Sequence, residues 1–329
     1  MTQITYVTGY FELPNTGRNF DVYLERASKF TLKIPNPLVI FCEPHTYSKI
    51  KAERDKYGYL THYVVRKFED MELHSHLPKI IDNRKIRPRA DPRNTPEYLI
   101  VTSSKFTMVR DAINKNIFGS LYYAWVDFGL VASQYSNMES LRTVSNDIIS
   151  NKREKVKMCF INYIAKAETL NLETYYHLHG KCGIAGTFFS GSAINLLKFM
   201  ELCIQCVKDT VSRGYGHNDE QIFLQVYFEC CNLRTQNALF DFYFGDYQYV
   251  ISNFTGFNTP ESKYITLNVL LPNIMKDITK HTNNTNNNIV LESKELVKNA
   301  VIFLMDGFRR GKLELDKGEI VRLFSYVIL

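Results

Sequence analysis

Short, uncharged apolar segments alternate with amphipathic segments along this chain, and this alternation restricts the fold more than any other feature. Residues 38–42 (LVIFC) and 121–126 (LYYAWV) carry no charged side chain. Runs of this length are typical of strands that are buried on both faces of a parallel sheet. Residues 19–30, by contrast, place apolar side chains at helical spacing. The alternation predicts a Rossmann-like α/β fold with a mostly parallel central sheet and helices on both faces.

The remaining elements follow from the same patterns. We expect a loop over the basic, proline-rich residues 78–96, followed by a helix that Ser103 or Ser104 caps. Further strands are expected at 3–12, 61–67, 158–165, 183–190 and 239–251, and further helices at 192–212, 218–230 and 292–310. With 45% hydrophobic residues, the chain can build one large core.

The domain boundary is placed near residue 260. Residues 1–260 are predicted to form one domain that binds its substrates. Residues 261–329 are predicted to be a C-terminal extension, with an asparagine-rich loop at 281–288 and one last helix, packed on the same domain.

Composition favours a soluble protein of a reducing compartment. No run of about 18 apolar residues occurs, and the first residues lack a secretory signal. Seven scattered cysteines, an odd number, suit free thiols better than a disulfide framework. We therefore expect a cytoplasmic location. The net charge of +6 is modest for this length and requires no nucleic-acid partner.

Two expected strands end in residues that suit a ligand site. In α/β sheets, ligands bind at the carboxyl ends of the strands. The first strand ends in Thr8, Gly9 and Tyr10. The small residues would let the backbone approach a ligand closely, and the aromatic ring could stack on a base, although an ordinary turn explains these residues equally well. Asp127 follows a buried strand and is placed to bind a divalent cation, or else to cap a turn.

Five segments, in this order, resemble the HtrL/YibB family of putative glycosyltransferases with a GT-A type fold. They cover roughly residues 1–260, and no single segment is very specific. The segments are Thr5-Tyr6-Val7-Thr8-Gly9-Tyr10-Phe11, Trp125-Val126-Asp127-Phe128-Gly129, the Gly186 segment Ala185-Gly186-Thr187-Phe188-Phe189, His217-Asn218-Asp219-Glu220-Gln221 and Phe244-Gly245-Asp246-Tyr247.

The resemblance implies a nucleotide-sugar donor, a glycan or other hydroxyl acceptor, and Mn²⁺ or Mg²⁺ held by Asp127. It implies Asp219 or Glu220 as the catalytic base, although an N-capping Asp with a first-turn Glu would look identical. It does not determine the donor sugar, the nucleotide base of the donor, the stereochemical course of the reaction or the oligomeric state. The donor-binding residues that it implies are Thr8, Gly9, Tyr10, Lys105, Trp125, Asp127, Gly186 and His179.

One departure from the family pattern leaves the function open. Many GT-A enzymes carry a second carboxylate where this chain has Gly129. Three explanations are open. Asp127 binds the metal ion together with a ligand from elsewhere in the chain, or the metal ion is bound weakly, or catalysis needs no metal ion. The same departure keeps a second hypothesis, a catalytically inactive protein of this fold that binds nucleotides or carbohydrates.

Three other clusters have ordinary explanations. The basic residues between Lys79 and Arg93 could close over a diphosphate, but a solvated loop is favoured. His74 with His76, and His177 with His179, would each share a strand face, and metal binding there is the less favoured hypothesis. The cysteines at 203 and 206 are expected to be buried in a helix rather than to bind zinc. Dinucleotide, Walker and serine-nucleophile motifs are absent.

Overall fold

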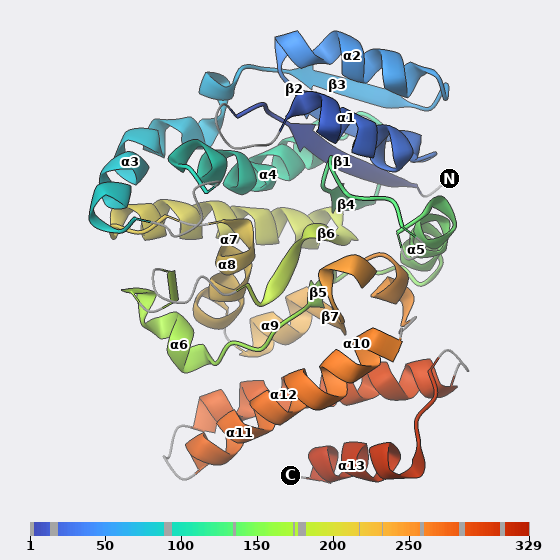
Figure 1. Ribbon diagram of the computed structural model, residues 1–329, viewed down its shortest axis with the longest axis vertical. Coiled ribbons are helices and arrows are strands. Elements are labelled where there is room, and N and C mark those ends of the chain that lie inside the picture. The colour runs from blue at the N-terminus through green and yellow to red at the C-terminus, as the bar shows by residue number, and fades with distance from the viewer. Residues whose placement is uncertain are drawn as a thin grey trace.

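The computed structural model describes residues 3–13, 19–88, 94–133, 136–173, 175–176, 182–216, 218–231, 233–256, 260–282, 287–309 and 313–328. Within these residues, seven strands form one sheet in the order β3-β2-β1-β4-β6-β5-β7 (Figure 1). The strands are β1 (Ile4–Tyr10), β2 (Leu38–Cys42), β3 (Thr61–Val65), β4 (Tyr122–Val126), β5 (Val156–Phe160), β6 (Ile184–Ser192) and β7 (Phe240–Phe244).

The sheet is mostly parallel. β1 pairs in parallel with β2 and β4, β2 pairs in parallel with β3, and β5 pairs in parallel with β7. Only β6 runs antiparallel to both of its neighbours, β4 and β5. Every residue of β2, β4 and β5 is buried, as in strands covered on both faces. β2 and β4 carry no charged side chain, whereas β5 buries Lys157. The predicted α/β class is confirmed.

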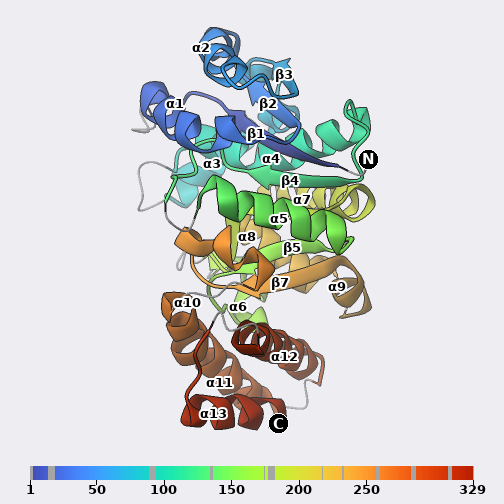
Figure 2. The same cartoon turned by 90° about the vertical axis from the view of Figure 1, so that its right-hand side faces the viewer.

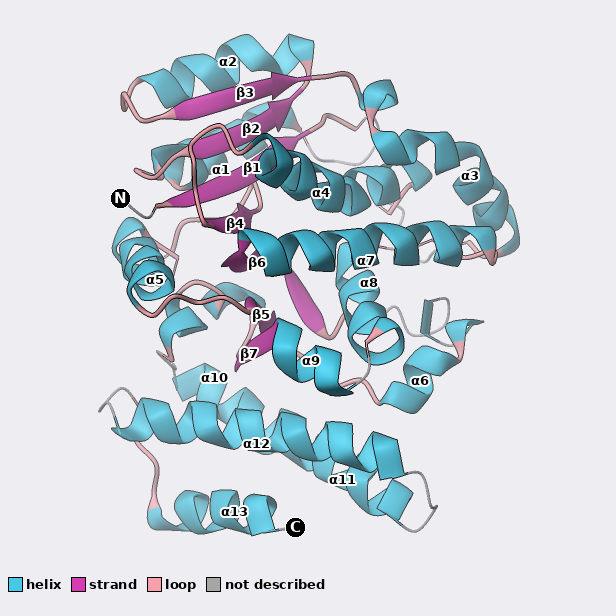
Figure 3. Cartoon of the chain, turned by 180° about the vertical axis from the view of Figure 1, so that it is seen from behind, coloured by secondary structure: helices cyan, strands magenta, loops and turns pink. Residues whose placement is uncertain are grey.

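Helices cover both faces of the sheet. Their bounds are α1 (Phe20–Lys29), α2 (Pro44–Asp55), α3 (Leu77–Ile86), α4 (Pro96–Lys115), α5 (Met138–Ser150), α6 (Lys166–Leu170), α7 (Ala193–Ser212), α8 (Asp219–Gln225) and α9 (Leu233–Leu239). Seen from behind, α4 and α7 lie side by side across β1, β4 and β6 (Figure 3). On the other face, Tyr6 of β1 bonds to Ser145 of α5, and Tyr10 packs against Phe20 of α1.

Four more helices follow the sheet: α10 (Pro260–Ile265), α11 (Leu271–Thr282), α12 (Asn287–Arg309) and α13 (Lys317–Ile328). They lie at the β7 end of the molecule (Figures 1 and 2). Phe303 of α12 packs against Phe244 of β7, with ring centroids 5.9 Å apart. The Tyr163 hydroxyl after β5 donates to Asp277 of α11 at 2.5 Å. None of the described helices is long and apolar enough to cross a membrane.

Three local expectations were wrong. Residues 77–86 form α3 rather than a loop, because Pro78 occupies the first helical turn, where its missing N–H costs nothing. Thr95, not Ser103 or Ser104, caps α4, and both serines lie buried inside that helix. His74 and His76 belong to a 3₁₀ segment (Glu72–His76) rather than to a strand.

A second group of expectations concerned α7 and the chain end. α7 begins after its Ser192 cap as predicted and buries Cys203 and Cys206 in its apolar face. No disulfide joins Cys42, Cys159, Cys182, Cys203, Cys206 and Cys231, the cysteines whose side chains the structure describes. The helix expected as the last one is followed by α13, which was not predicted.

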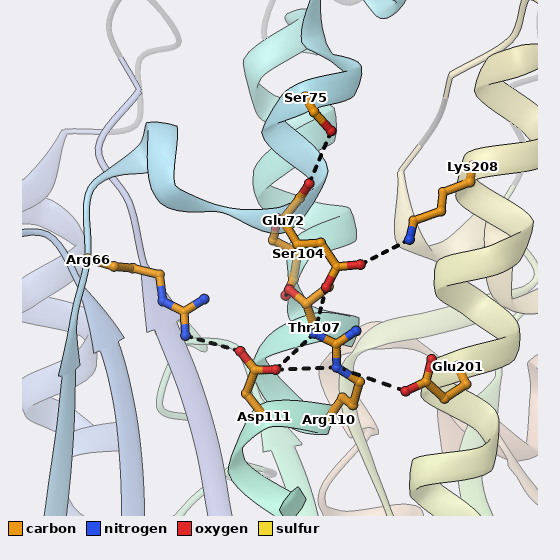
Figure 4. A network of polar contacts seen from close by, with 9 residues as sticks. All are labelled: Arg66, Glu72, Ser75, Ser104, Thr107, Arg110, Asp111, Glu201 and Lys208. Atoms are coloured by element: carbon orange, nitrogen blue, oxygen red, sulfur yellow. Dashed lines mark hydrogen bonds and ion pairs between the residues drawn. The ribbon is translucent and has the colours of Figure 1, made fainter. Parts of the chain in front are cut away.

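A polar network ties α4 to α7 and to the 3₁₀ segment before α3 (Figure 4). Arg110 of α4 donates to Glu72 at 2.6 Å and to Asp111 at 2.9 Å. Lys208 of α7 reaches the other oxygen of Glu72 at 3.0 Å, and Arg66 pairs with Asp111. The network joins these elements from outside the sheet, so α4 is held at a fixed position over β1 and β4.

Candidate functional site

A cavity of about 600 Å³ lies where the carboxyl ends of β1, β4 and β7 meet the beginning of β6. This is the edge at which ligands bind in α/β sheets. Its described lining is Gly9, Tyr10, Phe11, Leu13, Tyr23, Tyr98, Val101, Thr102, Lys105, Met108, Trp125, Asp127, Phe128, Gly129, Leu130, Val131, Ser133, Ser136, Gly186, Thr187, Asn218, Asp219, Glu220, Tyr247 and Gln248.

Lys105 of α4 is the centre of the charged part of the cavity. Its side chain is only 6% exposed, and its Nζ lies 2.5 Å from Asp219 Oδ2 and 3.3 Å from Asp127 Oδ1. The same ammonium donates to the Gly186 carbonyl oxygen at 2.9 Å. Burial alone would lower the pKa of Lys105, but the negative charges of Asp127 and Asp219 outweigh burial and raise it. Lys105 therefore stays protonated.

Asp127 is fixed by its backbone and by one of its two carboxylate oxygens. Its N–H donates to the Thr187 carbonyl oxygen at 2.9 Å, which extends the β4–β6 pairing by one residue. The indole Nε1 of Trp125 donates to Asp127 Oδ1 at 2.7 Å. The side chain is 37% exposed. Oδ2 has no hydrogen bond or ion pair within the described part of the chain and is available to a ligand.

Asp219 is the first residue of α8 and is 4% exposed. Burial raises the pKa of Asp219 to about 6, and the charges of Glu220 and Asp127 add to this rise, while Lys105 opposes it. Gly186 on β6 makes this position possible. A Cβ at residue 186 would lie 1.9 Å from Asp219 Oδ2.

Glu220 faces the cavity beside Asp219 and is held by two donors. Its Oε1 accepts from the Gly186 N–H at 3.2 Å and from the Tyr247 hydroxyl at 2.6 Å. Burial and the charge of Glu220 raise the pKa of Tyr247, so this hydroxyl remains a donor. Tyr247 was not among the site residues predicted from the sequence, although it belongs to the segment Phe244-Gly245-Asp246-Tyr247 that resembles the family.

An aromatic wall forms the other side of the cavity. The ring of Tyr10 lies 5.6 Å from that of Tyr23 and 5.4 Å from that of Phe128. A Cβ at residue 129 would lie 2.4 Å from the Tyr23 ring, so any larger residue must displace this tyrosine. A carboxylate at this position, which the family resemblance led us to consider, would need the space that Tyr23 occupies.

The described lining carries a negative net charge. It contains one lysine and the three carboxylates of Asp127, Asp219 and Glu220, which gives −2 when all are ionised. The ammonium of Lys105 is already shared among three oxygens. In the residues that the structure covers, no group of three His, Cys, Asp or Glu side chains is arranged to hold a metal ion.

Residues 2–255 match the family model of HtrL_YibB, described as a bacterial protein of unknown function. The chain belongs to the HtrL/YibB family. It is 24% identical over 261 residues to "Protein HtrL" of Escherichia coli (strain K12), an alignment that covers 71% of this chain and 87% of that protein.

A crystal structure of mouse xyloside xylosyltransferase 1 in its apo form is also similar, at 10% identity. The similarity covers 73% of this chain and 84% of that chain, with a TM-score of 0.39. That score is too low to support a shared chemistry.

Most of the expected site residues of this HtrL/YibB member meet at the cavity. They come from five elements or their ends and comprise Gly9, Tyr10, Lys105, Trp125, Asp127, Gly186, Asp219 and Glu220. Thr8 differs, because it is fully buried in β1 and does not line the cavity. His179 lies outside the described residues, as do His177 and His217. The roles given to these residues remain predictions.

The basic segment is placed away from the cavity as far as it is described. Arg87 follows α3, where it pairs with Glu173 at 2.7 Å and lies over the Tyr215 ring at 4.5 Å. Arg89 and Arg93 lie outside the described residues. Among the described residues of this segment, none lines the cavity.

Proposed function

We propose that this protein is a glycosyltransferase that moves a sugar from a nucleotide-sugar donor to a glycan or other hydroxyl acceptor. The observation that carries the proposal is the cluster of Lys105, Asp127, Asp219 and Glu220 in a cavity of about 600 Å³ at the carboxyl edge of the sheet. Aromatic side chains opposite the cluster offer surfaces for a nucleoside or a sugar ring.

Asp219 is the stronger of the two candidates for the catalytic base because of its pKa. A base works best when its pKa lies near the operating pH, and the pKa of Asp219 is raised to about 6. Glu220 is instead held by two hydrogen bonds, which suits a positioning role. In an inverting transfer, the acceptor hydroxyl gives its proton to Asp219 while its oxygen bonds to the anomeric carbon. The diphosphate leaves with the electron pair of the broken bond.

The residues fit a divalent cation that arrives with the donor. Mg²⁺ and Mn²⁺ are commonly bound by one or two carboxylates together with phosphate oxygens. Asp127 Oδ2 is available for this, and the net charge of −2 in the described lining would otherwise repel a diphosphate. When bound, the cation would offset the negative charge of the leaving diphosphate. Mn²⁺ or Mg²⁺ remains a prediction.

A second candidate function is a nucleotide- or carbohydrate-binding protein without catalysis. The observation that favours it is Tyr23, which fills the space next to Gly129 where a second carboxylate would lie. Both functions predict binding in the cavity, and only the first predicts turnover. A cytoplasmic location remains a prediction under either function.

A thermal-shift screen followed by a transfer assay separates the two. Nucleoside diphosphates and nucleotide-sugars are added with Mn²⁺, Mg²⁺ or EDTA, and a ligand at 100 times its Kd should add about 2.7 kcal/mol of stability. The best donor is then tested for transfer with wild type and Asp127→Asn. We expect stabilisation by one nucleotide, turnover in wild type and its loss in Asp127→Asn with an unchanged unfolding midpoint. Stabilisation without turnover would favour the binding protein. No stabilisation by any nucleotide would contradict the transferase and would leave only a carbohydrate-binding protein.

A further inference from the structure

The ammonium of Lys105 is surrounded as a metal ion would be. Its three neighbours are carboxylate oxygens of Asp127 and Asp219 and the carbonyl oxygen of Gly186, at 3.3, 2.5 and 2.9 Å. Carboxylate and carbonyl oxygens are the ligands that hard divalent cations take in proteins. The neighbours come from three separate places in the chain, the residue after β4, the start of α8 and β6, which converge on one point.

Three oxygens crowd this ammonium and leave little room for a substrate. Two of its three N–H groups donate to Asp127 Oδ1 and to the Gly186 carbonyl oxygen, and Asp219 Oδ2 lies against it as an ion-pair partner at 2.5 Å. The face of the Trp125 ring, whose centroid is 5.3 Å from Nζ, covers a further side. The positive charge of Lys105 is therefore directed at the two carboxylates that surround it.

A positive charge at this point also repels other cations. A divalent ion on Asp127 Oδ2 would lie beside the ammonium that is 3.3 Å from Oδ1 of the same carboxylate. Like charges at such distances repel each other, and water screens this ammonium little because its side chain is only 6% exposed. A single carboxylate next to a lysine is then a poor site for a cation that brings no other ligand.

We propose that Lys105 is a built-in cation, which occupies the position between Asp127 and Asp219 and keeps free divalent ions from binding there. A divalent ion then enters only together with a diphosphate, whose oxygens supply the additional negative charge. The second statement rests on the proposed function, whereas the first concerns this chain's own residues and holds without any nucleotide.

The test measures Mn²⁺ binding in the absence of nucleotide, by the loss of the free Mn²⁺ signal in electron paramagnetic resonance. We expect no saturable binding to wild type at this site. Lys105→Met leaves Asp127, Asp219 and the Gly186 carbonyl without their cation, so Mn²⁺ should bind at least about tenfold more tightly than to wild type. Adding Asp127→Asn to Lys105→Met should abolish the gain.

Lys208→Met is the matched control. It removes a lysine that lies 3.0 Å from Glu72, outside the cavity, so it changes the net charge equally. Glu72 keeps Arg110 as its partner, and no gain in Mn²⁺ binding is expected. If Lys208→Met gained as much as Lys105→Met, the effect would be general electrostatics and the proposal would be wrong.

The folding of Lys105→Met is informative as well. If the uncompensated carboxylates unfold the variant, Mn²⁺ should restore its cooperative unfolding transition, because a ligand of the folded state stabilises that state. A folded variant with wild-type Mn²⁺ affinity, or an unfolded one that Mn²⁺ does not rescue, would overturn the proposal. A further titration of wild type with Mn²⁺ and a nucleoside diphosphate addresses the donor separately. Its failure would count against the proposed function and the second statement, but not against the first.

Discussion

Asp219 illustrates how burial, rather than residue type, sets the chemistry of one carboxylate in this cavity. Its side chain is 6% exposed and lies beside two other carboxylates, while the 37% exposed Asp127 reaches solvent. Burial raises the pKa of Asp219 to about 6, although Lys105 lies 2.5 Å away. A single lysine shared with Asp127 does not offset the loss of hydration.

This pKa has a consequence for stability. The folded state binds the Asp219 proton up to about pH 6, whereas an unfolded aspartate releases it near pH 3.9. The contribution of the protonated form is fully present below the unfolded value and is lost as the pH rises through about 6. The free energy of unfolding of wild type, measured in urea, should therefore fall between pH 4 and 6 relative to that of Asp219→Asn. If the free energies of unfolding of the two proteins changed with pH in parallel, the raised pKa of Asp219 would be contradicted.

Residues at strand ends were predictable from sequence, and residues that reach the site by tertiary packing were not. Asp127 follows a recognisable strand and Gly9 lies near the end of another, and the topology of a parallel sheet gathers such ends at one edge. The Tyr247 hydroxyl meets Glu220 across a sequence separation of 27 residues, and no local pattern encodes that contact. The position of Tyr23 beside Gly129 could not be predicted from the sequence either.

At the scale of elements, the site depends on the close approach of α8 to β6. Asp219 and Glu220 begin α8, and both contact Gly186 near the beginning of β6. The sequence predicted both elements, because β6 is an apolar run punctuated by glycine and α8 has acidic residues in its first turn. It did not predict α3, because the density of proline and basic residues favoured a loop.

Gly186→Ala should disrupt this contact. The added Cβ would lie 1.9 Å from Asp219 Oδ2, so Asp219 must move away from Lys105, and we expect a loss of about 1–3 kcal/mol in the free energy of unfolding. Gly216→Ala is the control, since its Cβ would lie 3.5 Å or more from any neighbour. Urea denaturation of both variants measures the difference. Equal stability of the two would mean that α8 can shift without cost.

The whole molecule combines a family core with additional helices. The family match ends at residue 255, and the described sheet lies entirely within residues 4–244. The alternation of strands and helices predicted this sheet, but α10 to α13 carry no strand and match no part of the family. How they pack could not be predicted, because an amphipathic helix shows that it has an apolar face but not which surface covers it.

The predicted packing of residues 261–329 on the same domain can be tested at one contact. Phe303 of α12 is 8% exposed and lies against Phe244, which is fully buried on the edge strand β7. If sheet and helices unfold as one unit, Phe303→Ala should lower the free energy of unfolding of the whole chain by about 3–5 kcal/mol. Phe324→Ala, at a side chain that is 55% exposed, should change it little. Two separate unfolding transitions, with only the weaker one shifted by Phe303→Ala, would show instead that the C-terminal helices unfold independently, because a residue contributes only to the cooperative unit that contains it.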